Sequence, residues 1–375
     1  MRRREFLGMA AAGAAALARP VSAAPPAGPT LIYVGALPHK MLVLDEGEEK
    51  VVDRIELKTG VGRGFVLSTD RKKVFVNTWP RCGIEVIDRA SHQVIHSFEL
   101  DEPSNAHRYW LRSFAVEPQD RLVYTIVSTR TKQLDRFDIE MPKFAVVDPA
   151  AQKIVRFADY PKEELSSFAN TGGLKISPDG KYLYQFRDKL LIFDTTDFKL
   201  VDKIELARPA EFAEMENINV TIGDDPHDPP GIVTSVFTSA DPIVHRQVFG
   251  IARVDLAQRT YEFTPVGPAT TFMTGLKLSP DRKTGYLVAY RDTLGNRHTE
   301  FWVFDMTTKK IVKTVEFPAP TQIRFTLSGD GKKIFIYGSA PLVDIYDTAT
   351  MKIKKTLDMN ADLSGTMLVV PPTPA

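Results

Sequence analysis

The alternation of hydrophobic and polar residues along the chain is typical of short β-strands. Apolar runs of a few residues recur, and polar turns rich in Pro, Asp, Gly or Thr separate them. Seven of these runs end in an aspartate, at intervals of 42 to 61 residues. They are LVLD, EVID, AVVD, LIFD, ARVD, WVFD and DIYD, ending at Asp45, Asp88, Asp148, Asp194, Asp255, Asp305 and Asp347. The sequence therefore predicts a tandem array of β-rich units.

A tight polar turn precedes most of these aspartates. Pro, Asp and Gly in these turns fit a type I turn that joins two antiparallel strands. Another strand, such as IHSFEL, DKIEL or KTVEF, follows the aspartate, so each unit is predicted to contain four strands, A to D. The turns read STDRK at 68–72, EPQDR at 117–121, SPDGK at 177–181, SPDRK at 279–283 and SGDGK at 328–332.

Four-stranded repeats of this length are typical of a β-propeller, because one unit alone cannot bury both of its faces. The first unit lacks a strand A, since LIYVGAL and KMLVLD already correspond to strands B and C. The strand SGTMLVV at 364–370 is predicted to supply it and to close the ring. The predicted fold is an all-β, seven-bladed β-propeller of four-stranded antiparallel blades over residues 30–370. The seven aspartates are interpreted as turn-forming scaffold residues rather than a metal cluster.

The N-terminal segment differs from the repeats. MRRREFLGMAAAGAAALARPVSAA begins with basic residues, continues with an Ala-rich apolar stretch and has a small-x-small pattern, VSA, at 21–23. RREFL at 3–7 resembles the twin-arginine export signal of bacteria. Residues 1–23 are therefore predicted to be an export signal, 24–29 a linker and 371–375 a C-terminal tail. The mature protein is expected in the periplasm or outside the cell.

Composition narrows the functional classes. The formal net charge of +1 argues against a nucleic-acid binder, and no apolar run approaches the roughly 20 residues that span a bilayer. Cys82 is the single cysteine, which excludes an internal disulfide, Cys-pair metal sites and the C-x-x-C-H haem motif. No catalytic motif stands out, so the catalytic residues stay unknown.

One face of the predicted propeller collects unusual residues. The D-to-A connections and B-to-C loops of a propeller open on the same face, and they contain many arginines and aromatics here. Arg binds carboxylates bidentately, and Trp, Tyr and Arg dominate interface hot spots. The alternative is that these arginines pair with nearby acids and the aromatics cap the core. The predicted ligand- or partner-binding face contains Arg63, Trp79, Arg81, His107, Arg108, Tyr109, Trp110, Arg112, Arg187, Arg291 and Arg324, with Arg130, Lys132 and Arg136 in the B-to-C loop of blade three.

The stretch NAHRYWLRSF at 105–114 is the densest part of this set. It is interpreted as the connection that enters blade three. Its last residue occupies a core position that recurs in sister blades, whereas His107 to Arg112 do not repeat. The recurring core residues are Phe65, Phe114, Leu174, Leu276 and Phe325.

The segment GDDPHDPPG at 223–231 contains weak candidates for metal ligands: Asp224, Asp225, His227 and Asp228. Its prolines favour a stiff surface loop in place of an A–B turn, so no metal site is predicted.

The pattern SPDGKYLY…LIFDTTDFKLVDKIEL resembles YVTN-type bacterial propellers. The opening LIYVGALPHKMLVLD, the long third blade TRTKQLDRFDIEMPKFAVVD and the pair FRDKLLIFD most resemble the β subunit of quinohemoprotein amine dehydrogenase. The resemblance implies a propeller without its own cofactor, whose companion subunits carry haem and a tryptophan-derived quinone.

Three functions remain open. The chain is a recognition or scaffold subunit of a periplasmic amine-dehydrogenase-like redox complex, a stand-alone ligand- or partner-binding propeller, or a lactonase-like hydrolase. Independent catalysis is not expected; within a complex, the activity would be that of an amine dehydrogenase.

Overall fold

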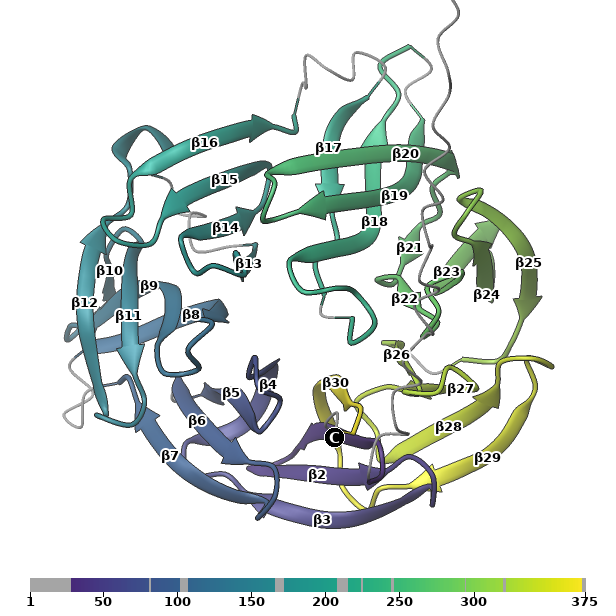
Figure 1. Ribbon diagram of the computed structural model, residues 1–375, viewed down its shortest axis with the longest axis horizontal. Coiled ribbons are helices and arrows are strands. Elements are labelled where there is room, and N and C mark those ends of the chain that lie inside the picture. Colours follow the sequence, from purple (N-terminus) through teal and green to yellow (C-terminus); the bar gives the residue numbers. More distant parts are fainter. Residues whose placement is uncertain are drawn as a thin grey trace, which may run out of the picture.

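The computed structural model describes residues 28–372, apart from 81, 224, 294, 102–106, 166–171, 208–214, 244–245 and 320–321. The predicted export signal, most of the linker, part of the tail, Arg81 and Asp224 lie outside the described residues. Seven antiparallel sheets surround a central axis like the blades of a propeller (Figure 1), which confirms the predicted fold class. The described part of the chain contains no α-helix and one 3₁₀ turn, η1 (Lys162–Glu164). It also contains no helix that is long and apolar enough to cross a membrane.

The first four blades each have an innermost strand near the axis and an outermost strand at the rim. From inside outward, blade one consists of β30 (Leu363–Val370), β1 (Leu31–Ala36), β2 (Lys40–Asp45) and β3 (Lys50–Glu56). Blade two consists of β4 (Gly60–Leu67), β5 (Lys73–Pro80), β6 (Gly83–Asp88) and β7 (Gln93–Glu99). Blade three consists of β8 (His107–Val116), β9 (Val123–Lys132), β11 (Lys143–Asp148) and β12 (Lys153–Asp159), with β10 (Phe137–Ile139) paired to β9. Blade four consists of β13 (Gly173–Ile176), β14 (Tyr182–Phe186), β15 (Lys189–Asp194) and β16 (Leu200–Glu205).

The last three blades follow the same order. Blade five consists of β17 (Glu216–Val220), β18 (Ile232–Ala240), β19 (Gln247–Asp255) and β20 (Thr260–Pro268). Blade six has a split inner strand, and consists of β21 (Phe272–Met273), β22 (Lys277–Leu278), β23 (Thr284–Thr293), β24 (Asn296–Asp305) and β25 (Lys310–Glu316). Blade seven consists of β26 (Arg324–Leu327), β27 (Lys333–Tyr337), β28 (Leu342–Asp347) and β29 (Ile353–Asp358).

Strand β30 closes the ring as the sequence predicts. It pairs with β1 in antiparallel register, from Leu31↔Val370 to Ala36↔Leu363, and so becomes the innermost strand of blade one (Figure 1). Its buried residues Met367 and Val369 pack in one apolar cluster with side chains of blades one and seven. The strand that closes the ring, β30, therefore also packs blade one against blade seven.

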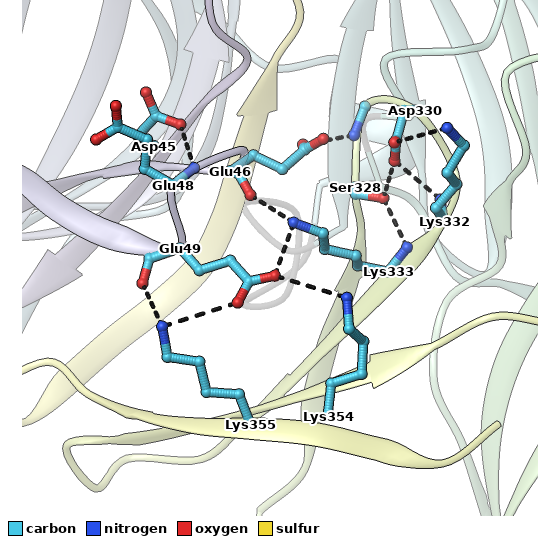
Figure 2. Close-up of polar contacts among 11 residues, drawn as sticks. Asp45, Glu46, Glu48, Glu49, Ser328, Asp330, Lys332, Lys333, Lys354 and Lys355 are labelled. Carbon is cyan, nitrogen blue, oxygen red and sulfur yellow. Dashed lines mark hydrogen bonds and ion pairs between the residues drawn. The ribbon is translucent and has the colours of Figure 1, made fainter. Parts of the chain in front are cut away.

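A polar cluster reinforces the junction of blades seven and one (Figure 2). The Glu46 carboxylate accepts a hydrogen bond from the Gly329 N–H at 2.6 Å. Lys333 donates to the Glu46 carbonyl at 2.8 Å and forms an ion pair with Glu49, also at 2.8 Å. The Lys333 contact is the main reason that the pKa of Glu49 lies below its ordinary value. The turn after β2 is thus fixed to the A–B turn of blade seven.

The seven aspartates have the scaffold role predicted from their spacing. Each carboxylate accepts a backbone N–H two or three residues further on, so it closes the C–D turn. The residue four positions after each aspartate has a positive φ, near 50–60°, which completes the turn. The donors for Asp45, Asp88, Asp148, Asp194, Asp255, Asp305 and Asp347 are the N–H groups of Glu48, Ser91, Ala151, Thr196, Gln258, Thr307 and Thr350.

The interpretation of NAHRYWLRSF as a connection is wrong for its described residues. His107 to Phe114 belong to β8, because β8 and β9 continue pairing out to His107↔Thr131. Arg63, Trp79, Arg130, Lys132, Arg291 and Arg324 also lie in strands rather than in loops. The predicted core position does recur: Phe65, Phe114, Leu174, Leu276 and Phe325 are all buried.

The Lys333 cluster makes a testable prediction about ring closure. Lys333→Met should lower the free energy of unfolding by about 1–3 kcal/mol, because the substitution leaves Glu49 and the Glu46 carbonyl without their closest cation. Lys354→Met is the matched control, since Lys354 reaches Glu49 only at 4.0 Å. Urea unfolding of the mature chain measures both variants, and equal effects of the two would contradict the prediction.

Candidate binding cavities

Seven of the predicted face residues line a single cavity between blades two and three. This blade 2–3 cavity has a volume of about 820 Å³. Its floor and walls come from β4, β5, β8, β9 and β10. The predicted residues that line it are Arg63, Trp79, Arg108, Tyr109, Trp110, Arg112 and Arg130.

β-Bulges place two of these arginines. The pairing of β4 with β5 shifts between Gly62 and Gly64, and the pairing of β8 with β9 shifts between Leu111 and Phe114. Arg63 and Arg112 therefore both lie in a bulge, two residues before the core phenylalanine of their blade. A bulge releases a side chain from the inward–outward alternation of a strand. Both exposed guanidinium groups line the cavity for this reason.

Trp110 provides an aromatic ring that two cations contact. The Arg130 guanidinium lies 3.8 Å from its ring centroid and that of Arg112 lies 4.9 Å away. Trp79 is 54% exposed at the same cavity and carries a second indole. Stacked guanidinium groups keep their N–H donors available at the edge, where a carboxylate binds well.

The carboxyl group and the thiol that line the cavity are both buried. The buried Asp101 carboxylate accepts the Tyr109 N–H at 2.7 Å. Burial raises its pKa, against the opposing effects of that hydrogen bond and of Arg108. Burial also raises the pKa of the Cys82 thiol to about 11, so it is protonated at neutral pH. The cavity therefore presents positive charge and hydrogen-bond donors rather than a nucleophile.

The cavity floor contains a polar atom without a partner. The Asn77 Oδ1 atom is buried and has no hydrogen-bond partner within the described structure. A Cβ atom on Gly64 would come within 2.5 Å of it, so glycine is needed here to make room for the amide. Asn77 thus adds an amide oxygen, unpaired among the described residues, to a cavity that is lined mainly by basic and aromatic side chains.

A projecting arm borders this cavity. The blade-3 arm, residues 132–141, is the long insertion that contains β10. Leu134 is fully exposed, and Phe137, Ile139 and Met141 are 59%, 67% and 55% exposed. Phe137 and Ile139 also line the cavity. The sequence patterns did not single out these apolar residues, although their exposure follows from an insertion that extends past the blade.

The other residues of the predicted face that the structure describes are not brought into this cavity. His107 Nδ1 lies 3.0 Å from the Thr131 hydroxyl, and Arg291 lies 3.8 Å from Glu300. Arg187 forms an ion pair with Asp188 at 2.6 Å and lines a separate cavity of about 630 Å³ beside blades four and five. Arg324 lines a third cavity near the axis. The predicted single face is therefore divided among several sites.

The segment 223–231 forms a long A–B connection of blade five, as predicted, and it crosses to other blades. Asp225 accepts N–H groups from His227 at 2.9 Å and from Leu278 of blade six at 2.8 Å. Asp228 accepts the N–H and the hydroxyl of Thr234, both at 2.8 Å. Burial is the main reason that the pKa of His227 lies below its ordinary value. These carboxylates hold the loop in place, and the described residues contain no group of three or more potential metal ligands.

Comparisons with known proteins support the fold class. The sequence matches no family model and no curated protein. A functionally unknown protein from Desulfotomaculum acetoxidans is similar in structure, with 13% identity, a TM-score of 0.55 and coverage of 92% of this chain and all of that one. Dihydro-heme d1 dehydrogenase NirN, in complex with DHE, gives 16% identity, a TM-score of 0.52 and coverage of 91% and 75%. A candidate 6-phosphogluconolactonase from Bacteroides fragilis gives 12% identity and a TM-score of 0.56. That match covers 92% of this chain and 98% of the other. At these identities the likeness establishes the propeller fold alone.

The blade-five loop makes a testable prediction about pH. Burial raises the pKa of Asp228 from 3.8 to about 6. The folded chain therefore holds this proton more tightly than the unfolded chain, and the resulting stabilisation is lost as the pH rises through about 6. Asp228→Asn stays neutral and should gain about 1–3 kcal/mol relative to the native chain between pH 4 and pH 7.5.

Urea unfolding of both proteins across this pH range measures the difference between their free energies of unfolding. The titration of His227 largely cancels in this difference, because His227 is present in both proteins. Asp135→Asn, at an exposed carboxylate of the arm, controls for the removal of one negative charge. A difference that does not change with pH would contradict the prediction.

Proposed function

We propose that this chain is an exported recognition subunit that binds a companion protein through the blade 2–3 cavity and the blade-3 arm. The observation that carries the proposal is the combination of exposed apolar residues on the arm with the indoles and arginines beside them. Contiguous exposed apolar surface next to Trp and Arg is typical of protein interfaces. The arginines favour an acidic partner segment, because Arg63 and Arg112 make no ion pair with a described residue.

The resemblance to amine dehydrogenase β subunits suggests what the companion is. In such a complex, haem and the tryptophan-derived quinone belong to companion subunits, and this chain supplies binding surface without a redox cofactor. The buried, protonated thiol of Cys82 fits a binding role for the cavity. A lactonase-like activity has no comparable support, since Asp101 is the one carboxylate among the described residues that line this cavity.

The proposal is tested by capture of the companion from a periplasmic extract of the native host. The tagged native protein should retain a protein with a haem or quinone absorbance spectrum. The double substitution Leu134→Ser/Phe137→Ser should reduce the captured amount at least tenfold, and so should Arg63→Ala/Arg112→Ala, since hot-spot residues of this kind contribute about 1–3 kcal/mol or more.

Val312→Ser is the matched control, because Val312 is also an exposed apolar side chain, 62% exposed on β25 of blade six. It should capture as much companion as the native protein. Equal capture by the arm, cavity and control variants would contradict the proposed surface. A captured protein without haem or quinone absorbance would contradict the redox complex while leaving the surface supported.

A further inference from the structure

A second cavity, near the propeller axis, has the features of a small-molecule site. This axial cavity, of about 380 Å³, lies between blades five, six and seven and also touches Thr366 of blade one. The inner strands β21, β22 and β26 and the start of the blade-five loop lie along its wall. Figure 1 shows these strands beside the axis. Most of its lining is apolar, from Ile222, Phe272, Met273, Leu276, Ile323 and Phe325. Its volume and apolar character fall within the range of ligand sites in proteins.

Arg324 is the unusual residue in this lining. Its Nη1 atom is buried and has no hydrogen-bond partner among the described residues, and none of their carboxylates lies within ion-pair distance. The Nη1 atom of Arg187 is likewise buried without a partner, but Arg187 still pairs with Asp188 at 2.6 Å, whereas Arg324 has no ion pair with a described residue. A buried guanidinium donor without an acceptor is costly, so it marks a place where an acceptor can bind with a large gain.

The acid that shares the cavity does not neutralise Arg324. Both oxygens of Asp225 accept backbone N–H groups, from His227 at 2.9 Å and from Leu278 at 2.8 Å. These bonds turn the carboxylate towards the backbone that it fixes. Lys277 adds a second positive charge to the lining. The axial cavity therefore combines a positive centre with apolar walls.

We infer that the axial cavity binds a small carboxylic acid with an apolar body, whose carboxylate accepts hydrogen bonds from Arg324. A planar guanidinium matches a carboxylate bidentately, and the surrounding aliphatic and aromatic side chains cover the rest of the ligand. Phe272, which is 41% exposed and packs 4.9 Å from Tyr290, marks the side of the cavity that is open to solvent. An aromatic ring on the ligand would stack there.

The experiment uses the mature full-length chain and three probes in isothermal titration. Phenylacetate carries both the carboxylate and the apolar body, phenylacetamide lacks the charge, and acetate lacks the body. Phenylacetate should bind, and the other two should bind at least tenfold more weakly. Arg324→Met should raise the Kd for phenylacetate at least tenfold. The Kd of Arg324→Lys should lie between those of the native chain and of Arg324→Met, because lysine keeps the charge without the planar pair of donors.

Two further measurements separate ligand binding from a structural role. Without ligand, Arg324→Met should be at least as stable as the native chain, since it removes a partly buried charge that has no ion pair with a described residue. Arg324→Met should still capture the companion protein, and Arg63→Ala/Arg112→Ala should still bind phenylacetate, so each proposal can fail without the other. Equal binding of acid and amide, an unchanged Kd in Arg324→Met, or no binding of phenylacetate up to about 10 mM would overturn the inference.

Discussion

The pairing of β30 with β1 is the contact on which the rest of the structure depends. No four-stranded blade can bury both of its faces alone, so each blade is stable only between two neighbours. Without β30, blade one would expose the edge of β1 and the apolar side chains that face blade seven. Lys333 strengthens the same junction from outside, through Glu46 and Glu49. A strand from the C-terminal end of the propeller sequence and turns from both ends therefore meet at one junction.

A closed ring also decides where binding chemistry can lie. The strands of each blade are occupied by their neighbours, and the useful space lies between blades and along the axis. The blade 2–3 cavity gathers side chains from two blades, and the axial cavity gathers them from four. The two differ in character: the first is open, basic and bordered by an apolar arm, and the second is small and mostly apolar around one guanidinium. The first suits a protein surface and the second a small molecule.

The repeats were sufficient to predict the architecture, because each physical role recurs in several blades. Asp45 and its six counterparts predicted the C–D turns, and the recurring apolar residue near Phe114 predicted the inner core. The binding cavities could not be predicted in the same detail, because they are formed by residues that differ from one blade to the next. The sequence predicted a connection over residues 105–114, whereas the extended pairing of β8 with β9 makes His107 the start of a strand. Arg112 and Arg324 line different cavities, because their strands lie in different blades and face different spaces. No local pattern in the sequence shows which cavity a strand faces.

The bulges at Arg63 and Arg112 have a consequence for how such a protein changes over evolutionary time. A residue in a bulge contributes little to the ladder of hydrogen bonds and little to the packed layers between blades. Its side chain can be exchanged while Phe65 and Phe114 keep the core intact. The residues that stabilise the fold are thus different from the residues that determine what the cavity binds. Point mutations at the bulges can therefore change the binding partner without a prior increase in the stability of the fold.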